Sequence, residues 1–402
     1  MTSCSSQETK DRTSPSCACR EASSHARKPD FPLIGDTTAS CCDTQPPIEG
    51  QSHEKPGYHL WGFVDDFIPT PAGDVPRVKT RLNREDQRGA LFARLGIGRD
   101  NYRIAPGLYA AGTPDEMAPV LVTANYKLTF DVLRSHLEGV HAWILVLETR
   151  GINVWCAAGK GTFGTREVLE RVKAVNLENI VSNRRLILPM LSATGVSARQ
   201  VKKRSGFEVV WGPVHAKHIP AFLDAGMQTN STMRKVTFTL RERVVLIPVE
   251  LNHMGRPSLY MIPALFLLSG LGSGLFSFSA AFARGIPALL AYVSAIVAGA
   301  VLVPVLLPWL PGRAFALKGA AIGAAAGSLL SAGFSRQLSP LEMLALTLFI
   351  TALSSYLSMN FTGSTPFTSP TGVEKEMRRA IPAQAVVVLT AVILWVGVGF
   401  TG

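Results

Sequence analysis

The sequence is organised around residues 143–165, which read WILVLETRGINVWCAAGKGTFGT. The first five residues are apolar and mostly branched, as in a buried strand. A short cysteine-containing segment and a run of glycines follow, and an amphipathic helix begins at Thr165. A strand, a glycine-rich turn and a helix in this order predict an α/β unit with a ligand site after the strand.

Cys156 lies at the third position of a predicted short helix whose N-cap is Asn153. Unpaired backbone N–H groups and the helix dipole favour the thiolate form of a cysteine at this position. Lys160, one turn later, adds a positive charge to the same face. The segment therefore predicts a thiol that binds a metal or reacts, although an inert cysteine held by packing is equally compatible with the pattern.

Strand and helix patterns alternate on both sides of this segment. We expect strands at 120–123, 143–147, 186–188, 207–211 and 236–240, and helices at 126–137, 165–175, 196–204 and 216–225. The helix at 126–137 carries Leu128, Val132 and Leu133 on its apolar face. The alternation predicts a Rossmann-like α/β domain with a mostly parallel, doubly wound sheet.

The sequence changes character after Glu250. Residues 259–402 contain only seven Lys or Arg and three Glu, in long apolar runs. We expect residues 251–402 to form an all-α membrane domain of five transmembrane helices, at about 259–279, 287–310, 314–334, 341–359 and 383–400. The distribution of Lys and Arg between the connections predicts a multi-pass protein of the cytoplasmic (inner) membrane, with its N-terminal domain in the cytoplasm.

Residues 1–55 are rich in Ser, Thr and Pro and predict a disordered tail. Five of the six cysteines lie in it, Cys4, Cys17, Cys19, Cys41 and Cys42. Their spacings match no zinc or iron–sulfur pattern, and the N-terminus lacks the apolar segment of a signal peptide, so we expect reduced thiols. The net charge of +11 could suggest nucleic acid, but no basic stripe with interleaved aromatics occurs, and we expect no nucleic-acid binding.

The glycines from Gly159 to Gly164 also match the G-x-G-x-x-G pattern of dinucleotide-binding proteins. In that class of site the glycines follow a strand directly, whereas here the Cys156 segment intervenes. A nucleotide-binding membrane sensor or transporter is therefore a disfavoured alternative.

Residues 153–165, NVWCAAGKGTFGT, resemble the cap-helix motif of the mercury-methylating corrinoid protein family. Residues 122–129, VTANYKLT, resemble the related large subunit of the corrinoid iron–sulfur protein of the acetyl-CoA pathway, and residues 106–109 and 206–207 extend this likeness. The resemblance covers about residues 60–402. The sequence departs from the family pattern at Asn183, Met190 and Arg199, all outside the Cys156 segment.

The resemblance implies that residues 56–250 form a cytoplasmic corrinoid-binding domain. Its cofactor would be a base-off, cobalamin-type corrinoid with the Cys156 thiolate as lower axial ligand of cobalt and as the catalytic group. The pattern Asp-x-His-x-x-Gly, which supplies a lower histidine in many cobalamin domains, is absent from the chain. The implied cofactor-binding residues are Asn153, Val154, Trp155, Cys156, Ala157, Ala158, Gly159, Lys160, Gly161, Thr162, Phe163, Gly164 and Thr165.

The implied function is methyltransferase activity that moves a methyl group from a methyl-Co(III) corrinoid to Hg(II), giving methylmercury. A thiolate donates more electron density to cobalt than imidazole does, which should favour this transfer. Implied partners are a ferredoxin-like iron–sulfur protein as electron donor and a methyltetrahydrofolate-linked methyl donor, because this chain has no ferredoxin-type cysteine run. The alternative is a membrane-anchored corrinoid methyl carrier of the acetyl-CoA and one-carbon pathway.

Overall fold

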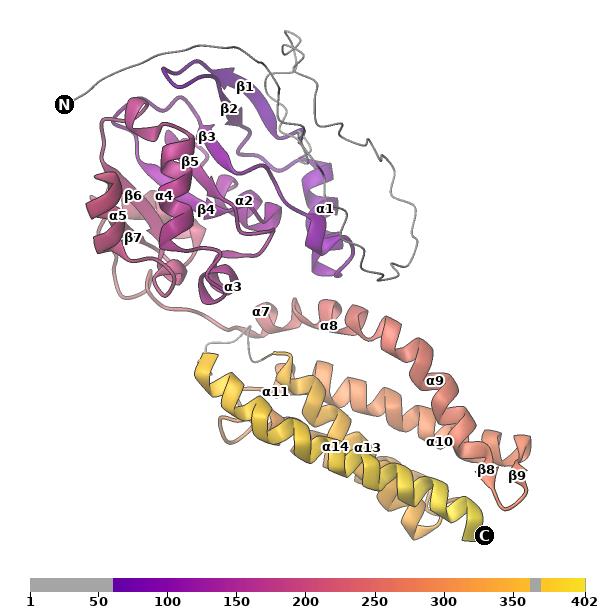
Figure 1. Ribbon diagram of the computed structural model, residues 1–402. Helices are drawn as coiled ribbons and strands as arrows, with labels where there is room; N and C mark the ends of the chain where they lie inside the picture. Colours follow the sequence, from indigo (N-terminus) through magenta and orange to yellow (C-terminus); the bar gives the residue numbers. More distant parts are fainter. Residues whose placement is uncertain (1–60, 362–369, 402) are drawn as a thin grey trace, which may run out of the picture. The chain divides into compact units, whose positions relative to one another are not determined.

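A computed structural model describes residues 61–361 and 370–401. In these residues an α/β region precedes a helical region (Figure 1). The predicted tail at 1–55, with its five cysteines, lies outside the described residues.

A seven-stranded mixed sheet forms the α/β region, in the order β1-β2-β3-β5-β4-β6-β7. The strands are β1 (Val64–Ile68), β2 (Val75–Val78), β3 (Gly107–Ala111), β4 (Val120–Ala124), β5 (Ala142–Leu147), β6 (Arg185–Pro189) and β7 (Glu208–Gly212). Strands β5, β4, β6 and β7 pair in parallel, which confirms the predicted parallel sheet for this part of the chain. Strand β3 joins β5 in antiparallel orientation, and the sheet continues through β2 to the antiparallel edge strand β1.

Helices cover both faces of the sheet. Helices α2 (Lys127–Arg134) and α6 (Ile219–Asp224) pack on one face, and α4 (Thr165–Ala174) and α5 (Ala198–Ser205) pack on the other. Strand β5 is buried along its whole length because its side chains alternate between the two cores. This arrangement explains the unbroken apolar run at 143–147.

The predicted strand at 236–240 is wrong. Residues 235–239 form no regular element, and α7 (Leu240–Val244) begins at the end of the expected strand. A capping box explains the difference, since the Thr239 side chain accepts a hydrogen bond from the Glu242 amide and the Glu242 carboxylate accepts one from the Thr239 amide.

The chain order around β4 creates a topological switch point. After β4 the chain passes through α2 to β5 on one side, and after β5 it crosses back to β6 on the other side of β4. The connections leaving β4 and β6 therefore diverge and open a crevice beyond the carboxyl ends of these strands.

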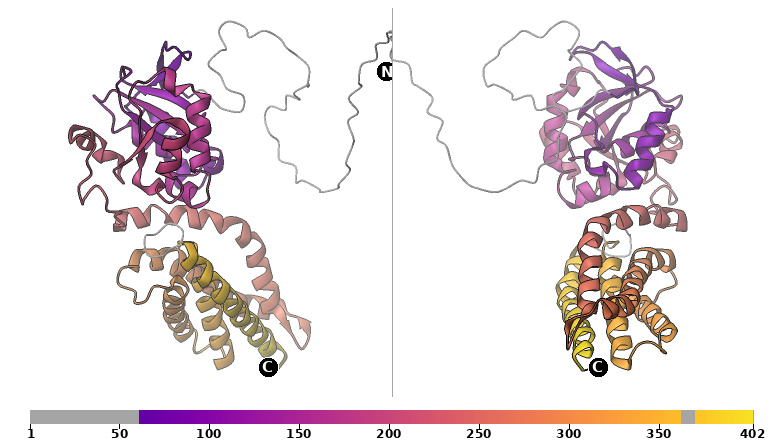
Figure 2. Two further views of the ribbon diagram at one scale, coloured as in Figure 1. Left: turned by 60° about the vertical axis from the view of Figure 1, so that its left-hand side comes forward. Right: turned by 90° about the vertical axis from the view of Figure 1, so that its right-hand side faces the viewer.

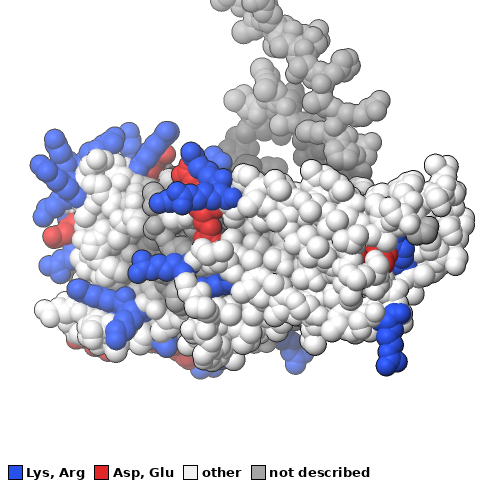
Figure 3. All heavy atoms as spheres, turned by 90° about the horizontal axis from the view of Figure 1, so that it is seen from below, with Lys and Arg blue, Asp and Glu red and all other residues white. Residues whose placement is uncertain are grey.

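The helical region contains α8 (Ile247–His253), α9 (Gly255–Gly270), α10 (Phe278–Ile296), a π-helical turn (Val297–Leu302), α11 (Val303–Leu306), α12 (Phe315–Gly333), α13 (Pro340–Met359) and α14 (Pro370–Thr401). Among the described residues, four helical stretches are long and apolar enough to cross a membrane: Phe278–Leu306, Phe315–Gly333, Pro340–Met359 and Gly372–Thr401. Figure 3 shows a face on which charged side chains gather toward one end, while a wide area carries almost none.

Five spans are not confirmed. The first predicted span is interrupted because α9 ends at Gly270 and the short strands β8 (Leu271–Gly272) and β9 (Leu275–Phe276) follow. At Gly272 an added Cβ would lie 2.5 Å from the carbonyl oxygen of Gly399. The second span begins at Phe278 rather than 287, the last begins at Gly372 rather than 383, and the third and fourth agree closely with the prediction.

Small residues bring the long helices together. Helices α10, α12, α13 and α14 lie side by side (Figure 2). On α12, Gly319, Gly323 and Gly327 meet α13, and an added Cβ at Gly323 would lie 2.8 Å from the Cβ of Ser354. This is the close backbone approach that glycines four residues apart permit in membrane helices.

Candidate functional site

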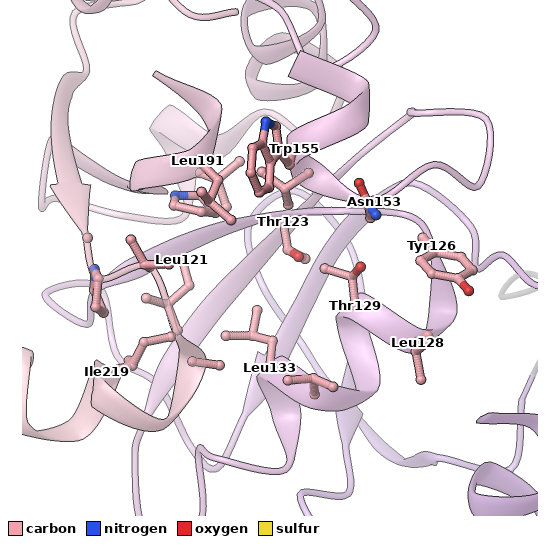
Figure 4. A pocket seen from close by; sticks show the side chains of 18 of the residues that line it. Leu121, Thr123, Tyr126, Leu128, Thr129, Leu133, Asn153, Trp155, Leu191 and Ile219 are labelled. Atoms are coloured by element: carbon pink, nitrogen blue, oxygen red, sulfur yellow. The ribbon is translucent and has the colours of Figure 1, made fainter. Parts of the chain in front are cut away.

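A pocket of about 460 Å³ lies at the switch point of the sheet. The carboxyl ends of β4, β6 and β7 and the beginning of α3 (Val154–Gly159) line it. Figure 4 shows Trp155 and Leu191 above the pocket, Leu133 below it, and Tyr126 and Ile219 near opposite ends. The pocket therefore occupies the position that the alternating sequence pattern predicts for a ligand.

The pocket wall is largely apolar. Its lining residues are Arg94, Arg99, Leu121, Val122, Thr123, Tyr126, Leu128, Thr129, Val132, Leu133, Asn153, Val154, Trp155, Ile187, Leu188, Pro189, Leu191, Gly212, Pro213, Val214, Ala216, Ile219, Val245, Leu246 and Val249. No acidic side chain is among them. A hollow of this character suits a large apolar ligand with a few polar contacts at its edge.

The turn before α3 is fixed by a buried amide. Asn125, at the end of β4, is fully buried, and its Oδ1 accepts hydrogen bonds from the Thr149 amide at 3.1 Å, the Thr149 hydroxyl at 2.9 Å and the Gly151 amide at 3.0 Å. Arg150 and Gly151 both have positive φ in this turn. Asn125 thus holds the loop that carries the Cys156 segment.

The predicted N-cap of α3 is confirmed. The Asn153 Oδ1 accepts a hydrogen bond from the Cys156 amide at 2.9 Å, with Asn153 in an extended conformation. This contact orients the first turn, in which Val154 and Trp155 reach the pocket wall.

Cys156 is a half-buried free cysteine directly after Asn153, Val154 and Trp155, which line the pocket. It is not itself a lining residue, and Lys160 is exposed at the C-cap of the helix. Residues 61–361 and 370–401 contain no group of three or more His, Cys, Asp or Glu side chains that could hold a metal ion.

The other predicted site residues serve mainly the packing of the chain. Ala157, Ala158 and Phe163 are buried in the core, and Gly159 and Gly161 are exposed. Thr162 donates a hydrogen bond to the Ala157 carbonyl at 3.3 Å, and Thr165 accepts one from the Ser197 amide at 2.8 Å.

The backbone conformation requires glycine at two of these positions. Gly161 has φ +79°, and an added Cβ at Gly164 would lie 2.9 Å from the Gly161 carbonyl oxygen. A positive φ and a close backbone contact explain these glycines without a ligand.

Helix α2 carries charged side chains on its buried side. Lys127, Asp131 and Arg134 are fully or almost fully buried, while Val132 is 40% exposed. The predicted apolar face of Leu128, Val132 and Leu133 lines the pocket. This face of α2 therefore forms part of the pocket wall.

Sequence reasoning missed a buried charge network beside α2. Lys127 Nζ lies 2.7 Å from Asp86 Oδ1 and 2.7 Å from Asp131 Oδ2, and Arg134 pairs with the same two carboxylates at 2.6 and 2.8 Å. Burial tends to raise the pKa of Asp86, but hydrogen bonds from Lys127 and Arg134 outweigh it and hold the pKa below its usual range. The spacing of Lys127, Asp131 and Arg134 on one helical stripe was the available signal.

Comparison with known proteins relates the α/β region to corrinoid proteins. The family described as CO dehydrogenase/acetyl-CoA synthase delta subunit matches residues 98–223. The corrinoid/iron–sulfur protein large subunit of Moorella thermoacetica is 31% identical over 193 residues, which are 43% of each chain. The acetyl-CoA decarbonylase/synthase complex subunit gamma of Methanopyrus kandleri is 33% identical over 128 residues, or 31% of this chain and 27% of that protein.

These matches cover only part of each protein. The gamma subunit of Archaeoglobus fulgidus is 31% identical over 128 residues and likewise matches 27% of its own length, so the chain spans less than half of these relatives. The similarity supports a relation to the corrinoid/iron–sulfur protein large subunit. The names of the relatives correspond to the acetyl-CoA alternative more closely than to mercury methylation.

Proposed function

We propose that residues 56–250 bind a corrinoid and use it for methyl transfer, and that residues 251–402 attach this domain to the cytoplasmic membrane. The observation that carries the proposal is the apolar pocket at the switch point, which is lined in part by Asn153, Val154 and Trp155, directly before the half-buried thiol of Cys156. The four apolar helical stretches support membrane attachment, with the N-terminal domain on the cytoplasmic side.

The residues present fit a corrinoid. A corrin ring is broad and largely apolar, and it supplies four nitrogen ligands to its cobalt, so the protein needs to add only one donor. The wall of Leu128, Val132 and Trp155 offers apolar contact, and Cys156 offers a thiolate. Asn153 orients this thiolate through the first turn of α3.

Each residue has a definite task in this proposal. The bound corrinoid supplies a cobalt centre that accepts and releases methyl groups. Cys156 would hold the cobalt through its sulfur, at a position that the Asn153 cap fixes. Trp155 would pack against the ring, and the apolar wall would exclude water from the metal.

We propose Hg(II) as the methyl acceptor, with methylmercury as the product, on the basis of the residue 153–165 motif. A ferredoxin-like iron–sulfur protein would supply electrons, and a methyltetrahydrofolate-linked donor would supply methyl groups. The second candidate is a methyl carrier for acetyl-CoA chemistry, and the names of the relatives favour it.

The visible spectrum of the corrinoid-loaded protein tests the axial ligand. Wild type should differ from Cys156→Ala, which removes the thiolate, and Cys156→His should give a third spectrum because imidazole replaces sulfur. Identical spectra for wild type and Cys156→Ala would exclude axial ligation by Cys156, and failure to bind any corrinoid would overturn both candidate functions.

A second assay separates the acceptors. The methyl-loaded protein is given either Hg(II) or an acetyl-CoA synthase, and loss of the methyl group is followed. Mercury methylation predicts Cys156-dependent formation of methylmercury, whereas the carrier function predicts transfer to the synthase and little reaction with Hg(II).

A further inference from the structure

One end of the pocket is positively charged, unlike the rest of its wall. Among the described residues, the Lys, Arg, Asp or Glu side chains that line it are Arg94, the last residue of α1 (Arg84–Arg94), and Arg99, the first residue of a short 3₁₀ turn. The Arg99 guanidinium carbon lies 5.3 Å from the centre of the Tyr126 ring. Tyr126 lies at the end of the pocket away from Ile219 (Figure 4).

The two arginines are not neutralised by the protein. Neither has a carboxylate within 4.0 Å in the part of the chain that the structure describes. Arg99 Nη1 donates a hydrogen bond to the Ala93 carbonyl at 3.2 Å, which holds the side chain across the turn. The charge of Arg99 also acts on Glu250. Burial raises the pKa of Glu250, and a hydrogen bond from Asn360 and the charges of His253 and Arg99 oppose the rise.

A buried hydroxyl lies at the same end. Tyr126 is 3% exposed, and its hydroxyl has no hydrogen-bond partner among the described residues. Burial raises the pKa of Tyr126, against the opposing charges of Arg99 and Arg94, so the phenol keeps its proton near neutral pH. Figure 4 shows the Tyr126 hydroxyl directed away from the hollow, so the ring of Tyr126 serves to position Arg99. The two arginines are the groups at this end that can bind a phosphate ester.

We propose that Arg94 and Arg99 bind the phosphodiester in the nucleotide tail of the corrinoid, with the Tyr126 ring positioning Arg99. The inference rests on the proposed corrinoid-binding function and deepens it by naming the part of the cofactor recognised at this end. In a base-off corrinoid the nucleotide tail is detached from cobalt, so its phosphate is available to the protein. The arginines would then select a complete cobamide over a corrinoid without the nucleotide tail.

Equilibrium titration of the full chain in detergent, followed by corrinoid absorbance, tests the proposal. The three ligands are cobalamin, cobinamide phosphate, which has the phosphate but no nucleoside, and cobinamide, which has neither. Wild type should bind the first two about tenfold or more tightly than cobinamide, the effect of a charge-assisted contact. Added salt should reduce this preference.

Substitutions assign the preference to the arginines. The double variant Arg94→Gln, Arg99→Gln should lose the preference for the two phosphate-containing ligands over cobinamide. Tyr126→Phe, which keeps the ring beside Arg99, should retain it. Arg88→Gln is the matched control, because Arg88 is exposed on the same helix and does not line the pocket.

The outcomes separate this inference from the proposed function. If wild type binds cobinamide as tightly as the other two ligands, phosphate recognition is wrong although corrinoid binding stands. A preference for cobalamin over both cobinamides would locate recognition at the nucleoside and also overturn the inference. If no corrinoid binds, the proposed function itself fails.

Discussion

Removing the buried ammonium of Lys127 should destabilise the α/β region severely. Lys127 is fully buried, and its Nζ is 2.7 Å from each of Asp86 and Asp131. In Lys127→Met, Arg134 is left to balance two carboxylates, so one negative charge is buried without compensation. Breaking a buried ion pair in this way costs about 3–5 kcal/mol. The methionine side chain fills most of the lost volume, so the electrostatic effect dominates.

Hydrogen exchange of the full chain in detergent, read by mass spectrometry, measures this loss. Peptides from α1 and α2 should exchange about 10²- to 10⁴-fold faster, since every 1.4 kcal/mol corresponds to a factor of ten. The control is Arg81→Gln, which removes an exposed ion pair to Glu138 and should leave exchange unchanged.

A double variant tests whether buried charge imbalance causes the destabilisation of Lys127→Met. Adding Asp131→Asn to Lys127→Met restores the balance between one carboxylate and Arg134, so the double variant should exchange more slowly than Lys127→Met alone. If the two substitutions are instead additive in their destabilisation, buried charge imbalance is not the cause.

Three further outcomes follow from the same geometry. Gly323→Leu, which forces side-chain atoms against Ser354, should destabilise the helical region by about 1–3 kcal/mol. Gly333→Ala should not, because an added Cβ at Gly333 meets no atom within 4 Å, and thermal unfolding in detergent compares the two variants. The folded pKa of Asp86 lies below its unfolded value of 3.8, so its contribution to stability is complete above pH 3.8 and disappears as the pH falls through the folded value. Near-ultraviolet circular dichroism should show this acid-sensitive step in wild type and a smaller one in Asp86→Asn. Trp155→Ala should weaken corrinoid binding about 10- to 100-fold by loss of a packing aromatic, with Trp155→Phe close to wild type, and equal affinities for all three proteins would remove Trp155 from the site.

Local sequence patterns predicted those parts of the structure that depend on local interactions. The apolar run at 143–147 becomes β5, and Asn153 caps α3 because its side chain and the Cys156 amide are three residues apart. The predicted strand at 236–240 was wrong because the Thr239 capping box begins a helix there. Alternating apolar and polar residues favour a strand, and the sequence alone does not show that the capping box outweighs this pattern. The first predicted span was not confirmed because α9 ends at Gly270 and a glycine-rich segment follows. The long apolar run at 259–279 gives no sign of this break.

The candidate site could be located from the sequence, but its chemistry could not be derived in the same way. The alternation of strands and helices predicts a ligand site beyond the carboxyl ends of the strands, and the cap predicts an oriented cysteine. Cobalt, methyl and mercury entered only through the resemblance of residues 153–165, because a thiolate binds many soft metals equally well in principle. Arg94 and Arg99 lie before the quoted motifs at 106–109, 122–129 and 153–165. They became candidate binding residues only because the fold places them in the pocket wall with Tyr126.

Helix α2 joins the stability of the domain to its proposed function. An amphipathic helix ordinarily directs its apolar stripe into the core, yet here Lys127, Asp131 and Arg134 occupy buried positions and Val132 lies in the pocket wall. The buried charges are tolerable because each cation meets two carboxylates and the network is neutral as a whole. Their burial leaves Leu128 and Val132 facing the hollow, where an apolar ligand would cover them. Phe130 and Leu133 of the same helix are buried in the core, so α2 contributes apolar side chains both to the core and to the wall of the pocket.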